Sequence, residues 1–304
     1  MSVFTKFAII GAGGVGGTVA DELLKKGEAV SVTILTRDES KPELQAFKAR
    51  GATLVQVSYD DQDAVKKALT GSEVAVSTVS PFHMDVQKAV VPAAKAAGIQ
   101  LFVPAEYGVR VTEGPNVAKK EVQDLLSQHD LPFVVFYTGL FAEFLPHFLG
   151  YHYDEGYMTV VGKGETAFSI TSRTDAGRFV AHVLSTAPKS ALEGAKLAFE
   201  AERLSPLQIR DLVETKLNKK IELCYVDLEE NKKKLQHGLR GLPHDHLRGG
   251  PRRGRHGAGG GGHDRQVLPG LEPGQVRVLH CVSEWIKQKR SHQVRTGPMY
   301  STSL

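Results

Sequence analysis

The sequence predicts an α/β protein built from an open, doubly wound parallel sheet and a smaller α+β lobe. Two observations support this fold class. In the first half of the chain, short β-branched and apolar runs alternate with longer segments of helical period, which is the pattern of repeated β-α units. The short runs are also apolar on both faces, as expected for strands that helices cover on both sides of a sheet.

Six such runs mark the expected strands, at residues 7–10, 30–35, 53–57, 73–79, 101–104 and 132–137. After the first strand comes TVADELLKKG, where Val19, Ala20, Leu23 and Leu24 form one apolar stripe and Gly27 supplies a helix stop signal. Right-handed crossovers between such units place ligands beyond the carboxyl ends of the strands. We therefore look for a functional site in the loops that follow the strands.

A second region is expected where the pattern changes to an aromatic-rich and turn-rich stretch. We expect a first domain over residues 1–142 and a smaller lobe over residues 143–304. In that lobe, Ser205 and Pro206 match the N-cap and first position of a helix, and a strand is expected at residues 221–226. An irregular segment rich in Gly, Arg and His, at about 238–275, is too poor in large apolar residues to build a core.

The charge is uneven along the chain. Residues 240–304 carry 11 Lys or Arg against four Asp or Glu, so the first 239 residues have a net charge of −3 within a formal total of +4. The two cysteines, Cys224 and Cys281, lack metal-ligand spacing and are too few for a disulfide framework. No signal-peptide pattern or run of about 20 apolar residues is present. We expect a cytoplasmic protein that contacts no membrane.

Residues 8–17 read AIIGAGGVGG and follow the first expected strand. Gly11, Gly13 and Gly16 give the spacing G-x-G-x-x-G, whereas Gly11, Gly14 and Gly17 give G-x-x-G-x-x-G. Either spacing lets main-chain N–H groups approach a diphosphate at a helix N-terminus. Because the motif lies between an apolar strand and an amphipathic helix, we expect a Rossmann-type domain that binds a dinucleotide.

The second strand ends in LTRDES, with Arg37 where an NAD-binding protein usually has an acidic residue. A guanidinium group at this position can hold a 2'-phosphate, which favours NADPH as the cofactor. Asp38 is the alternative, because a small register shift would place its carboxylate on the ribose. Lys41 is interpreted as a solvated loop lysine.

Lys119 is the best candidate in the sequence for a group that transfers protons beside the dinucleotide. None of the tyrosines has a lysine four residues later, so the usual Tyr-x-x-x-Lys pair is absent. In NVAKKEVQDLL, a helical wheel places Lys119 at the margin of the buried stripe and Lys120 away from it. Lys119 could then hydrogen-bond a ribose hydroxyl or transfer a proton to substrate, or it could be an ordinary helix lysine with a buried stem.

Over roughly residues 5–235 the sequence resembles the isoflavone reductase-like and NmrA-like atypical short-chain dehydrogenases/reductases. The motifs that carry the resemblance, in order, are GAGGVGG, LTRDES, STVSPFHMDVQKAVVPAAKAAGI, FVPAEYG, the helix with Lys119, TGLFAEF and SRTDAGRFVAHVL. Plant reductases usually have serine where this chain has Ala105, so no hydroxyl contact is expected there. Glu106 and Tyr107 are interpreted as structural, with Glu106 paired inside the protein.

The resemblance implies the wider glycine spacing and a set of site residues. Lys119 would be the single catalytic lysine. The cofactor would contact the glycine loop, the 2'-phosphate arginine, the end of the fourth strand, the next helix and the nicotinamide pocket, through Gly11, Gly14, Val15, Gly17, Arg37, Ser77, Thr78, Val79, Gln87, Lys119 and Phe141. Apart from the resemblance, we expect an apolar and aromatic pocket over residues 141–157 to hold the substrate, and the alternative is that these side chains only pack in the core.

These observations predict an NADPH-dependent reductase that acts on a C=C or C=O bond of a small aromatic or polyketide-like metabolite. The alternative is an NmrA-like redox sensor that binds NAD(P) without turnover and regulates a protein partner. Nucleic-acid binding by the Arg- and Gly-rich tract is a weaker hypothesis, because no aromatic residues are interleaved to stack bases. The histidines of that tract have irregular spacing, so no metal site is expected.

The tract near residues 238–277 also has the composition of GC-rich coding DNA read out of frame. We hypothesise a shifted reading frame or a mispredicted intron there, which sequencing of the transcript tests. An unchanged tract in the message would exclude the hypothesis.

Overall fold

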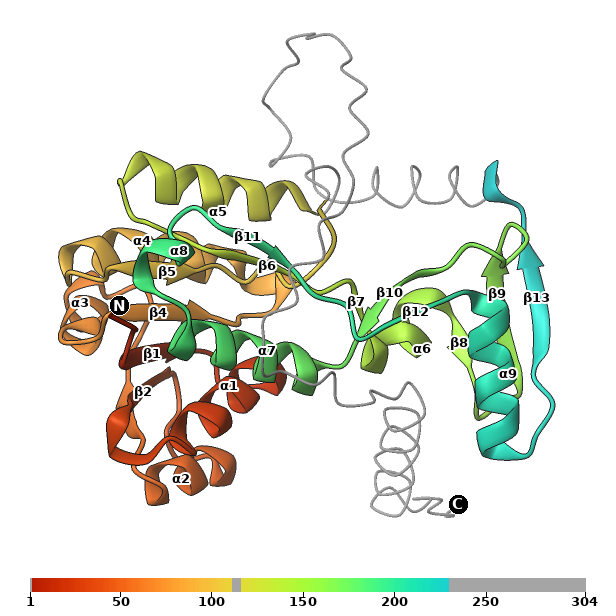
Figure 1. Cartoon of the computed structure of the whole chain (residues 1–304), viewed down its shortest axis with the longest axis horizontal. Coiled ribbons are helices and arrows are strands. Elements are labelled where there is room, and N and C mark those ends of the chain that lie inside the picture. Colours follow the sequence, from red (N-terminus) through yellow and green to blue (C-terminus); the bar gives the residue numbers. More distant parts are fainter. Residues whose placement is uncertain (1, 111–115, 230–304) are drawn as a thin grey trace, which may run out of the picture. The chain divides into compact units, whose positions relative to one another are not determined.

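A computed structural model describes residues 2–110 and 116–229 (Figure 1). The described chain forms two compact units. The first contains residues 2–145 and 167–204, and the second contains residues 146–166 and 205–229. The chain therefore leaves the first unit after residue 145, returns to it at residue 167 and leaves it again after residue 204. The division after residue 142, expected from composition, stays a prediction.

The first unit is organised by a five-stranded parallel sheet with the strand order β3-β2-β1-β4-β5. Its strands are β1 (Lys6–Ile10), β2 (Ser31–Thr36), β3 (Thr53–Gln56), β4 (Val74–Ser77) and β5 (Leu101–Val103). The order reverses at β1, which pairs with β2 on one side and β4 on the other. This is the switch point at which open α/β sheets bind ligands.

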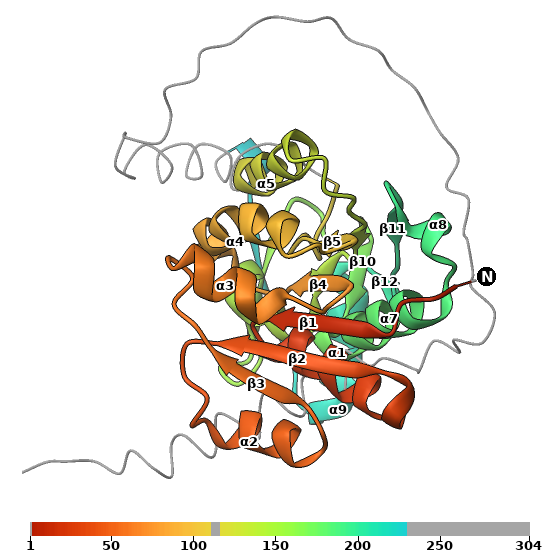
Figure 2. The same cartoon turned by 90° about the vertical axis from the view of Figure 1, so that its left-hand side faces the viewer.

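Helices cover both faces of this sheet (Figures 1 and 2). The face with α1 (Gly14–Leu24) and α2 (Pro42–Ala49) is opposite the face with α3 (Gln62–Leu69), α4 (Met84–Ala96) and α5 (Val117–Gln128). A hydrophobic core cluster lies under α3, α4 and α5 and contains fully buried Ile10, Ala75, Val90, Phe102 and Val122. Burial of such side chains contributes roughly 1.5–3 kcal/mol each, so the sheet is a rigid base for the loops at its edge.

Further segments extend the first unit. β6 (Val135–Tyr137) runs parallel to β11 (Lys196–Ala198), and a parallel bridge joins Phe102 to Phe133. β10 (Phe168–Thr171) pairs with β7 (Leu140–Phe141) and β12 (Glu202–Leu204). α7 (Arg173–Thr186) packs along α1 (Figure 1), and Gly177 permits this packing because a methyl carbon there would lie 2.6 Å from Cβ of Thr18. The remaining elements of this unit are η1 (Gly27–Ala29), η2 (Pro81–His83), η4 (Ala142–Phe144) and α8 (Lys189–Leu192).

The second unit begins within α6 (Leu145–Leu149) and contains a small sheet of order β13-β9-β8. Its elements are β8 (Tyr151–His152), β9 (Tyr157–Val161), α9 (Pro206–Leu217) and β13 (Glu222–Val226). Ser205 caps α9 through a reciprocal capping box with Gln208, as its sequence predicts. Lys219 donates to the carbonyl oxygen of Asp154 at 2.7 Å, which ties the turn after α9 to the loop before β9.

All six strands expected in the first half are present, so the predicted doubly wound parallel sheet is confirmed. The irregular segment expected at about 238–275 lies outside the described residues. Among the helices that the structure describes, none is long and apolar enough to cross a membrane.

Candidate functional site: the carboxyl edge of the parallel sheet and Lys119

The glycine turn between β1 and α1 requires its small residues. Gly11 has φ +89°, a conformation that L side chains rarely adopt. A methyl group on Gly16 would overlap the carbonyl oxygen of Gly11 and the hydroxyl of Thr78, so the chain can only make this turn with glycine there. Gly16 belongs to the narrower spacing, and Gly14 and Gly17 belong to the wider one. A methyl carbon at any of these three positions would lie close to neighbouring atoms, so glycines of both spacings are tightly packed.

The turn joins the end of β4 by hydrogen bonds. The N–H of Thr78 donates to the carbonyl oxygen of Ile10 at 3.0 Å, and its hydroxyl donates to that of Gly11. Ser77, in register with Ile10, is fully buried, and its Oγ has no hydrogen-bond partner among the described residues. An unpaired buried hydroxyl at the switch point is a group that a ligand can satisfy.

The N-terminus of α1 is open to an anion. Gly13 is the N-cap residue and supplies no side-chain cap, and the first turn contains no acidic residue. The first N–H groups of a helix have no partner within the helix, and the helix dipole favours negative charge there. The glycine cradle and the unpaired hydroxyl of Ser77 therefore fit the diphosphate of a dinucleotide.

Arg37 is exposed immediately after β2, where an adenosine 2'-phosphate would be held. The alternative residue, Asp38, accepts hydrogen bonds at Oδ1 from the N–H of Ser40 at 2.9 Å and from its hydroxyl at 2.6 Å. These bonds hold the pKa of Asp38 below its ordinary value. The carboxylate of Asp38 is thus engaged in its own loop, which favours Arg37 as the ligand of this position.

Lys119 lies on α5 with its side chain 14% exposed, whereas the side chain of Lys120 is 52% exposed and paired with Asp124. The predicted orientation of the two lysines is confirmed. The ammonium of Lys119 donates to the carbonyl oxygen of Glu106 at 2.5 Å and lies 3.5 Å from its Oε1. Lys119 is therefore held just beyond the carboxyl end of β5.

Glu106 is a buried acid with two side-chain partners. Besides Lys119, Gln123 donates to its Oε2 at 2.8 Å. Burial raises the pKa of Glu106 and outweighs the opposing effects of Lys119 and Gln123. Sequence reasoning expected Glu106 to pair inside the protein, and the structure identifies Lys119 and Gln123, both on α5, as its partners.

The turn that contains Glu106 is fixed to neighbouring strands. Tyr107, with φ +31°, donates from its hydroxyl to the carbonyl oxygen of Ser77 at 3.2 Å, and burial raises the pKa of this phenol, which keeps it a donor. Thr138 donates to the carbonyl oxygen of Tyr107 at 3.0 Å. A methyl carbon on Gly108 would lie 2.9 Å from Nζ of Lys119. The turn thus fixes the lysine and leaves room for it.

The remaining expected residues occupy different environments. Gln87 is fully buried; its Oε1 accepts from the N–H of Ala105 at 2.8 Å and its Nε2 contacts the sulfur of Met84. Its amide therefore supports the Glu106 turn, and contact with a nicotinamide stays a prediction. Val15 is buried in α1, and Val79 packs partly buried against the core. Phe141 lies in β7 with its ring centroid 6.0 Å from that of Phe144.

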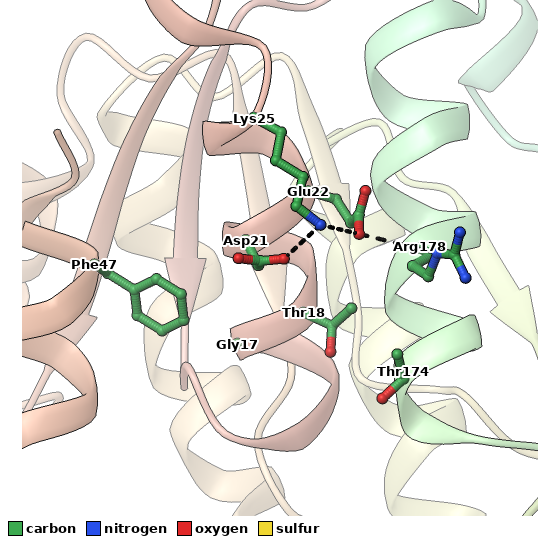
Figure 3. A pocket seen from close by; sticks show the side chains of 8 residues that line it. All are labelled: Gly17, Thr18, Asp21, Glu22, Lys25, Phe47, Thr174 and Arg178. Carbon is green, nitrogen blue, oxygen red and sulfur yellow. Dashed lines mark hydrogen bonds and ion pairs between the residues drawn. The ribbon is translucent and has the colours of Figure 1, made fainter. Parts of the chain in front are cut away.

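A hollow of about 450 Å³ lies beside α1 in the first unit (Figure 3). It is lined by Gly17, Thr18, Asp21, Glu22, Lys25, Phe47, Thr174 and Arg178. Its acidic groups are already paired, since Lys25 lies 2.8 Å from Asp21 and 2.7 Å from Glu22. The hollow extends along α1 away from the switch point, so we do not assign the chemistry to it.

Comparisons with known proteins identify the family of the chain. The model of the NmrA-like family matches residues 5–247, and the chain belongs to this family. It is 31% identical over 192 residues to oxidoreductase aprR of Aspergillus flavus, a match that covers 59% of this chain but only 63% of that protein. It is 24% identical to phenylcoumaran benzylic ether reductase PT1 of Pinus taeda, over 74% of this chain and 79% of that one.

Among solved structures, the binary complex of leucoanthocyanidin reductase with NADPH from Vitis vinifera aligns with a TM-score of 0.65 at 23% identity. The alignment covers 78% of this chain and 81% of that one. At this identity the likeness establishes a shared Rossmann-type fold.

Proposed function

We propose that the protein is an NADPH-dependent reductase that reduces a C=C or C=O bond of a small aromatic or polyketide-like metabolite. The observation that carries the proposal is the position of Lys119, whose ammonium is mostly buried and fixed at the carboxyl edge of a sheet whose switch point fits a dinucleotide. The names of the relatives, an oxidoreductase and a benzylic ether reductase, support it.

The residues have separate roles in this proposal. The glycine turn and the N-terminus of α1 bind the diphosphate, Ser77 donates its free hydroxyl to the cofactor, and Arg37 binds the 2'-phosphate. When bound, NADPH would supply the hydride that reduces the substrate. Lys119 would hydrogen-bond the substrate oxygen on which negative charge develops and provide the proton that completes the reduction.

The exposed neighbour of Lys119 offers a matched control. NADPH oxidation is followed with a panel of enones and aryl ketones for the parent protein, Lys119→Ala and Lys120→Ala. We expect turnover of at least one compound, a loss of at least 100-fold in kcat for Lys119→Ala, and near-parental activity for Lys120→Ala. Equal activity of the two variants would refute the role of Lys119.

The same experiment separates the reductase from the redox-sensor alternative. A sensor would bind NADPH but oxidise it with no compound of the panel, and its affinity for a protein partner would depend on the redox state of the dinucleotide. The region between residues 141 and 157, expected to hold the substrate, is divided between the two units, and its role stays a prediction.

A further inference from the structure

Besides Arg37, which follows β2, another arginine lies beside the glycine turn. No sequence motif or residue spacing predicts a role for this arginine. Arg173 is the first residue of α7. A methyl carbon on Gly14 would lie 2.7 Å from Nη1 of Arg173 and 2.8 Å from its Cδ. The side chain of Arg173 therefore rests against the first residue of α1, where the open N–H groups of that helix begin.

The side chain of Arg173 is held at its base. Its main-chain N–H donates to both carboxylate oxygens of Glu143, at 2.9 and 3.2 Å. Nε lies 3.7 Å from Oε1 of Glu143, and the guanidinium carbon lies 5.2 Å from the ring centroid of Phe144. An ion pair and a cation–π contact thus direct the guanidinium group toward the turn.

Glu143 compensates the charge of the Arg173 guanidinium only in part, because the two groups are 3.7 Å apart and the buried Nε makes no hydrogen bond to any described residue. The side chain remains 35% exposed. The N-terminus of a helix also carries positive partial charge, so a guanidinium beside it is unfavourable unless an anion joins the two. A diphosphate has the charge and the paired oxygens that guanidinium groups bind.

We propose that Arg173 contacts the diphosphate of the bound dinucleotide, opposite the N–H groups of α1. The proposal rests on the proposed function, because it concerns the same cofactor. It divides the binding of the cofactor between two arginines. Arg37 would bind the phosphate on the adenosine ribose, and Arg173 would bind the bridge between the two nucleotides.

The helix provides a matched control in Arg178, on the same helix and 49% exposed. Arg178 lies beside the hollow of Figure 3, with Nε 3.9 Å from Glu22 and Nη1 3.7 Å from Asp175. Its partners are therefore carboxylates on α1 and α7. Arg178→Gln removes one positive charge from α7 without changing the glycine turn.

The test uses two ligands, NADPH and adenosine 2'-monophosphate, which lacks the diphosphate bridge. Their dissociation constants are measured calorimetrically for the parent, Arg173→Gln, Arg173→Lys and Arg178→Gln. We expect Arg173→Gln to weaken NADPH binding about tenfold or more and to leave adenosine 2'-monophosphate binding within twofold. Arg173→Lys should recover part of the loss, and Arg178→Gln should bind both ligands like the parent.

The dependence of NADPH affinity on salt concentration gives a second readout. Arg173→Gln removes a cation that would contact phosphate, so its NADPH affinity should change less with ionic strength than that of the parent. If Arg173→Gln binds NADPH within twofold of the parent, the proposal is wrong and the proposed function is unaffected. A variant that unfolds at lower temperature but binds NADPH normally also overturns the proposal, since Arg173 would then be purely structural. If the parent itself binds no NADPH, the proposed function and this proposal fail together.

Discussion

The ammonium group of Lys119 hydrogen-bonds the main-chain carbonyl oxygen of Glu106 at 2.5 Å and lies 3.5 Å from a carboxylate oxygen of the same residue. Two groups of one residue thus hold the lysine beside the carboxyl edge of the sheet. Tyr107 fixes the same turn to the end of β4. The position of the proposed proton donor therefore depends on Glu106.

This dependence predicts a pH effect. Burial raises the pKa of Glu106 above its ordinary value of 4.5. On acidification Glu106 therefore becomes protonated at a higher pH than an exposed glutamate, and its ion pair with Lys119 is then lost. We expect kcat/KM of the parent to fall as the pH drops through this raised pKa. Glu106→Gln should have lower activity throughout and lack that decline. Identical pH–rate profiles for the two proteins would show that the carboxylate does not position Lys119.

The same shift has a consequence for stability. A raised folded-state pKa means that the carboxyl group favours folding when protonated, and that this contribution is lost as the pH rises through the raised pKa. Relative to the parent, Glu106→Gln should therefore gain stability between about pH 4.5 and neutrality. Urea unfolding at several pH values measures the difference.

The glycine turn predicts a sharp contrast between two neighbouring glycines. A methyl group on Gly16 would overlap main-chain and side-chain atoms of the turn, whereas one on Gly13 would meet nothing within 4 Å. We expect Gly16→Ala to lower the free energy of unfolding by about 1–3 kcal/mol or more. Gly13→Ala should change it by less than about 1 kcal/mol. Similar values for the two variants, from denaturant titration, would contradict the packing described for the turn.

Arg37 predicts the choice between cofactors. Because its guanidinium group is the proposed ligand of the 2'-phosphate, Arg37→Ala should remove the preference for NADPH over NADH and leave NADH binding nearly unchanged. Lys41→Ala, in the following loop, should keep the preference. Fluorescence titration of both cofactors measures the ratio. A preference that survives in Arg37→Ala would assign the 2'-phosphate to another residue.

At the opposite edge of the sheet, Glu73 predicts an acid-dependent stability. Burial by itself raises the pKa of Glu73, but Lys189 and the N–H groups of Thr5 and Lys6 reverse this and hold it below the ordinary value. Because the folded-state pKa is lowered, ionised Glu73 stabilises the protein at pH values above the ordinary pKa of 4.5. This stabilisation is lost as the pH falls through the folded-state pKa.

Glu73→Gln should therefore lower the free energy of unfolding at pH 7 by about 1–3 kcal/mol, and this deficit should shrink below about pH 4.5. Glu121→Gln serves as the control, because Glu121 is 52% exposed in its pair with Lys88 and such pairs contribute at most about 1 kcal/mol. A deficit for Glu73→Gln that stays constant down to pH 3 would show that its ionisation is not what stabilises this edge.

Much of the first unit could be predicted from sequence because its signals are local. Runs that are apolar on both faces identify strands such as β1 and β4, and the helical wheel distinguishes Lys119 from Lys120, because the period of α5 alone decides which lysine turns toward the core. The capping of α9 by Ser205 is similarly local.

The features that sequence patterns do not indicate depend on contacts between distant segments. Gly14 and Arg173 are far apart in the sequence, and only the packing of α7 on α1 brings them together. Likewise, no local pattern indicates that residues 167–204 belong to the first unit. Their place there depends on the parallel pairing of β11 with β6, two strands that are far apart in the sequence. The hydrogen bond from the N–H of Ala105 to the side-chain amide of Gln87 could not be predicted for the same reason.

The proposed chemistry depends above all on the turn after β1, which must bind a dinucleotide that carries a 2'-phosphate. Calorimetric titration of the full chain with NADPH, NADP⁺ and NADH measures this directly. We expect saturable binding of both phosphorylated forms, at least tenfold tighter for NADPH than for NADH. A folded protein that binds none of the three would contradict the assignment of this turn.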